Sequence, residues 1–64
     1  MSFDSKNDCI NYIMEEIKKY SFIDEKKSNT LNNILWKKDY DELYRLANMI
    51  DRFGLDIIMT VVHD

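Results

Sequence analysis

The segment from 39 to 53 constrains the fold more than any other, because its apolar residues surround most of a helix. At about 100° per residue they cover an arc of roughly 220°, whereas a helix with one buried face needs only about 100°. One face contains Leu43, Leu46, Ala47, Ile50 and Phe53, extended by Tyr40 and Tyr44 on one side and Met49 on the other. Such a helix lies at the centre of its own fold or is shared with a partner.

Apolar residues recur along the chain at the spacing of an α-helix, which predicts an all-α fold. We expect a small three-helix bundle, with helices at about 5–20, 24–37 and 39–53. The sequence has no proline and a single glycine, so it offers neither a linker nor the turn residues of a β-hairpin. The whole chain, residues 1–64, is therefore predicted to be one helical domain.

Capping residues indicate where these helices begin and end. Ser5 is expected to cap the first helix, and Asp39 the third, which Gly54 should terminate. The second helix has two candidate caps, Asp24 and Ser21.

The last apolar segment, 55–62, fits two structures. Its β-branched residues suit a strand, but the chain offers no second strand signal to pair with it. We expect a short helix, and the alternative is a strand that pairs across a dimer.

The size of the chain favours association with a second copy. A domain of 64 residues buries only about 60% of the surface of its unfolded chain, so small domains often need a disulfide, a metal or oligomerisation. Cys9 and His63 are the only cysteine and histidine, so one copy forms neither a disulfide nor a Cys/His zinc site. We predict a homodimer, and the alternative is a compact helical monomer. The expected contacts are Leu55, Ile57, Ile58, Met59, Val61 and Val62.

Catalysis is not expected. Cys9 falls on the apolar face of the first helix, His63 has no positioned partner, and the sequence contains no metal-binding or glycine-rich phosphate loop. No cofactor is expected either. The longest apolar stretch is interrupted by Asp56 and is far shorter than the roughly 20 residues of a membrane span. We expect a protein in the cytoplasm of the producing or host cell, and the composition fits a phage or mobile-element origin.

The charged residues suggest two alternative functions, although helix electrostatics explains the positions of these residues more simply. The lysine pairs 18–19, 26–27 and 37–38 could follow a nucleic-acid backbone, in a small regulator. The acids Asp39, Asp41 and Glu42 could mimic DNA. However, the lysines follow acids at helical ion-pair spacing or end a helix, and the acids lie in a first helical turn.

Aromatic residues give the leading functional hypothesis, a non-catalytic module that binds another protein as an adaptor or inhibitor. Trp, Tyr, Met and Arg are enriched where proteins meet. The predicted contact patch contains Trp36, Tyr40, Tyr44 and Met49, with Arg45 at its rim. In the alternative interpretation, Trp36 only covers the corner between the second and third helices.

Overall fold

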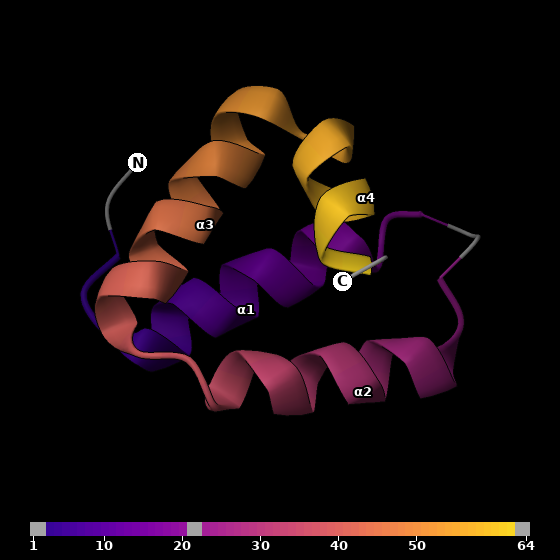
Figure 1. Cartoon of the computed structure of the whole chain (residues 1–64), viewed down its shortest axis with the longest axis horizontal. Helices are drawn as coiled ribbons and strands as arrows, with labels where there is room; N and C mark the ends of the chain where they lie inside the picture. Colours follow the sequence, from indigo (N-terminus) through magenta and orange to yellow (C-terminus); the bar gives the residue numbers. More distant parts are fainter. Residues whose placement is uncertain (1–2, 21–22, 63–64) are drawn as a thin grey trace.

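The fold is all-α, as predicted. The computed structural model describes residues 3–20 and 23–62, and within them every regular element is a helix (Figure 1). The elements are α1 (Lys6–Ile17), α2 (Glu25–Trp36), α3 (Tyr40–Phe53) and α4 (Leu55–Val62). The segment 55–62 is therefore a helix, and the strand alternative is wrong.

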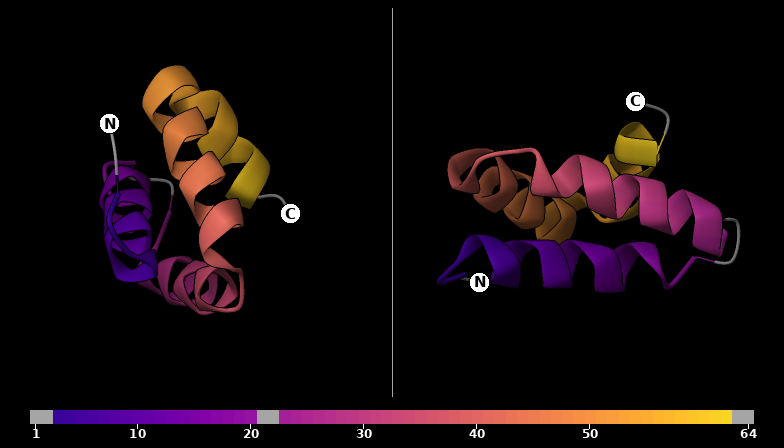
Figure 2. Two further views of the ribbon diagram at one scale, coloured as in Figure 1. Left: turned by 90° about the vertical axis from the view of Figure 1, so that its left-hand side faces the viewer. Right: turned by 90° about the horizontal axis from the view of Figure 1, so that it is seen from below.

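Helix α1 is the base on which α2 and α3 pack. Its most extensive contact is with α3, and it also packs along α2, while α4 folds back onto α3. Seen from below, α1 forms one layer, α2 and α3 lie in the next, and α4 lies on the side away from α1 (Figure 2). Helices α2 and α3 thus both pack on α1, and α4 packs on α3.

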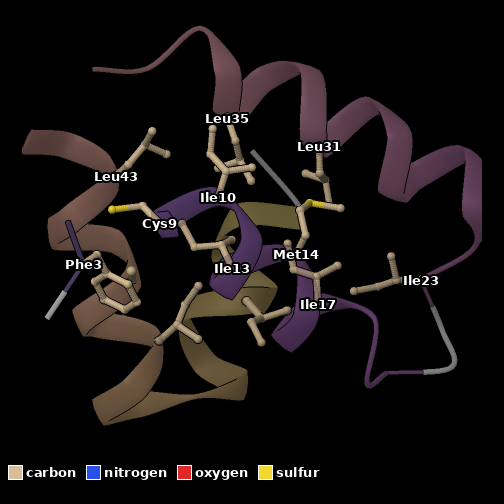
Figure 3. Packing of buried hydrophobic residues seen from close by; sticks show 13 residues of the cluster. Phe3, Cys9, Ile10, Ile13, Met14, Ile17, Ile23, Leu31, Leu35 and Leu43 are labelled. Atoms are coloured by element: carbon tan, nitrogen blue, oxygen red, sulfur yellow. The ribbon is translucent and has the colours of Figure 1, made fainter. Parts of the chain in front are cut away.

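The core is continuous across all four helices. Figure 3 shows Cys9 of α1 pointing toward Leu43 of α3, and Met14 toward Leu31 of α2. The buried cluster comprises Phe3, Cys9, Ile10, Ile13, Met14, Ile17, Ile23, Leu31, Leu35, Leu43, Ala47, Ile50 and Ile58. The accessible surface is 4447 Å², close to the roughly 4,300 Å² expected of a compact monomer of this mass. One copy therefore closes its core without a second, and the homodimer stays a prediction.

The predicted caps of the helices are confirmed. The backbone N–H of Asp8 donates to the side chain of Ser5 at 3.1 Å. The side chain of Asp24 accepts from Lys27 N–H at 2.8 Å. Asp39 accepts in the same way at the start of α3, at 2.9 Å. These bonds satisfy N–H groups that have no partner within the helix, which fixes the start of each helix. Ser21 lies outside the described residues.

The end of α1 differs from the prediction. The helix stops at Ile17 rather than at Tyr20. The N–H of Lys19 bonds the carbonyl of Glu16, and that of Tyr20 bonds Ile17, so both bonds span three residues instead of four. The chain tightens into turns there and leaves the helix, which lets Ile23 return to the core.

Helix α4 uses part of its apolar surface inside its own chain. Ile58 is 0% exposed, so it is not available for the contact with a second copy that the sequence suggested. Ile57 and Met59 are half-buried. The side chains of Leu55, Val61 and Val62 lie outside the described residues.

Candidate interaction surface

The side of α3 that faces away from the core forms an open hollow of about 710 Å³. We call this surface the outer face of α3. It lies opposite the buried residues Leu43, Ala47 and Ile50. In the left view of Figure 2, α3 faces the viewer and no other helix lies in front of it. The outer face is lined by Tyr40, Asp41, Tyr44, Arg45, Asn48, Met49, Arg52 and Phe53.

The outer face has a polar centre between two apolar rims. At about 100° per residue, Tyr40 and Tyr44 fall on one edge of the helix, whereas Met49 and Phe53 fall on the other. Between them lies a polar stripe, which consists of Asp41, Arg45, Asn48 and Arg52. A polar centre of this kind favours a partner with matching polar groups over a purely apolar one.

The tyrosine rim is held in place by the N-terminal segment. The hydroxyl of Tyr40 donates to the carbonyl of Phe3 at 2.5 Å. The ring of Tyr44 meets that of Phe3 edge-on, with centroids 5.9 Å apart, and lies 5.7 Å from the ring of Tyr40. Burial raises the pKa of Tyr40, so its hydroxyl stays a donor at neutral pH. A rim fixed in this way loses little side-chain freedom on binding.

The second rim is more exposed than the sequence suggested. Phe53, which the helical pattern groups with Leu43, Leu46, Ala47 and Ile50 on one face, is 56% exposed and does not share the burial of Leu43, Ala47 and Ile50. At 100° per residue it lies about a quarter-turn from the centre of the buried face, beyond the cover that the neighbouring helices provide. Met49 is also exposed, and it lines a second hollow of about 260 Å³ with Leu46 and Glu42.

Trp36 is separate from the outer face. Its side chain is 45% exposed. The ammonium group of Lys6 lies 5.8 Å from the centre of its ring and donates to its backbone carbonyl at 2.7 Å. Four of the five predicted interaction residues thus share one surface, and Trp36 lies at the junction of α1 and α2 instead.

The polar stripe is unpaired within the described part of the chain. There, Asp41, Arg45 and Arg52 form no ion pair or hydrogen bond through their side chains. Asn48 uses its amide N–H to donate to the carbonyl of Tyr44 at 2.9 Å, and its amide oxygen accepts no bond from any described residue. The stripe therefore offers one acid, two arginines and one amide oxygen to a partner.

Sequence reasoning missed half of this surface. The sequence did not single out Asp41, Asn48 and Arg52 as contact residues for another protein. Their spacing was the available signal, since with Arg45 they follow one another at intervals of four, three and four residues along one side of α3.

The remaining charges are largely explained by local contacts. Lys19 pairs with Glu16 at 2.5 Å, and Lys38 pairs with Glu42 at 3.3 Å. One lysine of the pair 18–19 and one of the pair 37–38 thus contact an acid of an adjacent helix, while Asp39 caps α3.

Within residues 3–20 and 23–62, no group of three or more acidic, histidine or cysteine side chains is placed to hold a metal ion. None of the helices there combines the length and the hydrophobicity that crossing a membrane requires. No protein-family model, curated protein or solved structure matches this chain.

Proposed function

We propose that this chain is a non-catalytic protein-interaction module, acting as an adaptor or inhibitor, whose contact surface is the outer face of α3. The observation that carries the proposal is that two apolar rims flank charged side chains without an ion-pair partner among the described residues, on the one side of α3 that faces away from the core. Aromatic, methionine and arginine side chains are the types that dominate contacts between proteins.

The pattern of exposure supports this surface over other parts of the molecule. Ile34 and Trp36 are also exposed, but neither lines the hollow on the outer face of α3. On α3, Tyr40, Met49 and Phe53 are exposed together and surround arginines without partners. Burying such a surface removes apolar area from water and gives the arginines partners.

The test is capture of a partner by the tagged chain from the cells that produce it. The variant Met49→Ser with Phe53→Ser changes two exposed side chains and should leave stability within about 0.5 kcal/mol of the wild type. The matched control is Ile34→Ser, at an exposed apolar position on α2. We expect the control to retain the partner and the α3 variant to lose it.

Equal capture by both variants, with circular dichroism showing that both are folded, would refute the proposal. A second, untagged copy of the chain counts as a partner in this assay, because the proposal concerns the surface and not the identity of what covers it.

A further inference from the structure

The polar stripe on the outer face of α3 is complementary to itself. Asp41 and Arg52 lie near its two ends, about 16 Å apart along the helix axis at 1.5 Å per residue. Both side chains lack an ion-pair partner among the described residues. The midpoint between them is also the midpoint between Arg45 and Asn48, which lie closer to the centre of the helix.

From this arrangement we infer that the outer face of α3 binds the same face of a second copy, with the two helices antiparallel. The inference rests on the proposed function and names its partner. In a dimer with a twofold axis the same patch is used by both subunits, so every contact occurs twice. A twofold axis through the shared midpoint therefore fixes the register of all four stripe residues at once.

In that register each polar group meets a complementary one. Asp41 of one copy stands level with Arg52 of the second, which gives two ion pairs. Arg45 stands level with Asn48 of the second copy. The amide oxygen of Asn48 can accept from that arginine, because only its N–H group is engaged, with the carbonyl of Tyr44. The three charged side chains of the stripe, which have no ion-pair partner among the described residues of one copy, and the amide oxygen of Asn48 thus all gain a partner in the dimer.

The apolar rims meet in the same arrangement. A twofold axis perpendicular to the two helices keeps each edge on its own side, so the tyrosine rim faces the tyrosine rim of the second copy. On the other side, the two Met49 side chains lie about 8 Å apart along the helix axis, whereas the two Phe53 side chains lie about 20 Å apart, at the ends of the contact. The apolar side chains nearest the twofold axis, Tyr44 and Met49, are therefore partly covered as the ion pairs form.

Arg45, which lies close to the twofold axis, can distinguish a second copy from a different protein as the partner. The two Arg45 side chains approach each other there, which is a like-charge contact. Arg45→Gln removes that repulsion, and its amide N–H can still donate to Asn48 of the second copy, so this variant should not weaken the dimer. If the natural partner were instead a different protein with an acidic helix, Arg45 would be an attractive contact and its removal would weaken binding.

The dimer should be weak. The contact is a single helix of 14 residues against its copy, which is about 21 Å long. Such a contact falls below the roughly 1,200 Å² of the smallest stable interfaces. We expect a dissociation constant between about 10 µM and 1 mM.

The experiment is sedimentation equilibrium on the purified full chain, from 10 µM to 2 mM. Asp41→Arg places an arginine opposite Arg52 twice, and Arg52→Asp places an acid opposite Asp41 twice. Each variant should weaken the dimer by at least about tenfold. The matched control is Glu25→Arg, which makes the same change of charge in the first turn of α2, away from the outer face.

Restoration is the decisive measurement. An equimolar mixture of the Asp41→Arg and Arg52→Asp chains should form a heterodimer of wild-type strength, because all ion pairs are then opposite in sign. The double variant Asp41→Arg with Arg52→Asp should restore the homodimer. Restored association cannot come from a variant that fails to fold. Circular dichroism identifies any variant that is unfolded.

Three results would overturn the inference. They are a wild-type monomer at 2 mM, a dimer that Glu25→Arg weakens as much as Asp41→Arg does, and a mixture that does not restore association. A wild-type monomer whose capture of another protein still depends on Met49 and Phe53 would overturn the dimer while leaving the proposed function standing. If Arg45→Gln then weakens that capture, the partner presents an acidic helix.

Discussion

Gly54 makes the sharp turn between α3 and α4 possible. Its backbone has φ +62° and ψ −119°, and its N–H donates to the carbonyl of Ile50 at 2.7 Å. These dihedrals match the first central residue of a type II′ turn, the mirror image of the conformation near −60° and +120° that L residues adopt easily. A Cβ at this position would meet only the carbonyl oxygen of Ile50, at 3.9 Å. An alanine here is therefore strained through its backbone and not through a clash.

The cost of Gly54→Ala follows from two opposing terms. Holding an L residue in this region costs about 1–3 kcal/mol. The lower freedom of alanine in the unfolded chain returns about 0.4–1 kcal/mol. We expect a net loss of about 1–2 kcal/mol, and a domain of this size loses about 4–8 °C of Tm for each kcal/mol.

The assay is urea unfolding followed by circular dichroism, with a third protein made by chemical synthesis that carries D-alanine at position 54. D-alanine prefers the mirror-image dihedrals, so it should stabilise the fold by about 0.4–1 kcal/mol. Opposite signs for the two enantiomers would establish backbone strain as the cause. If both destabilise the protein equally, or if Gly54→Ala changes nothing, the reasoning is refuted.

Two further predictions concern the core. Ile58→Ala should cost about 2–5 kcal/mol, because Ile58 is fully buried, whereas Thr60→Ala on the exposed side of α4 should change stability by less than about 0.5 kcal/mol; similar urea midpoints for the two variants would show that α4 does not dock as described. Burial, with a contribution from Asp8, raises the pKa of Cys9 above its ordinary value of 9.0. The folded state then keeps a proton that the unfolded state releases, so this contribution to stability should be complete below about pH 9 and be lost as the pH rises through the raised pKa of the folded state. Cys9→Ala should flatten that decline in urea titrations, and an unchanged slope would contradict the assignment.

The helix starts could be predicted because a cap is a local property. Ser5, Asp24 and Asp39 each bond an N–H group three residues ahead, which the sequence alone specifies. The end of α1 was harder, since Lys18 and Tyr20 are compatible with a longer helix. Its termination depends on returning Ile23 to the core, which is a contact between distant parts of the fold.

The sequence could predict that α3 carries an interaction surface, but not which residues belong to that surface. The sequence showed that the apolar arc of α3 exceeds one buried face, and it identified Tyr44 and Met49 as surface candidates. It could not show which edge the neighbouring helices cover. In the structure the N-terminal segment packs on the tyrosine edge through Phe3. The opposite edge, with Phe53, stays exposed.

The position of Trp36 makes its intrinsic fluorescence a probe of the contact between α1 and α2. It is the only tryptophan in the chain, and its half-exposed ring lies beside the ammonium of Lys6, at the start of α1. Intrinsic emission will therefore sense the separation of the two helices that meet there more than the hydration of the core. An anionic quencher such as iodide, drawn by that ammonium, should extinguish the signal more efficiently than neutral acrylamide.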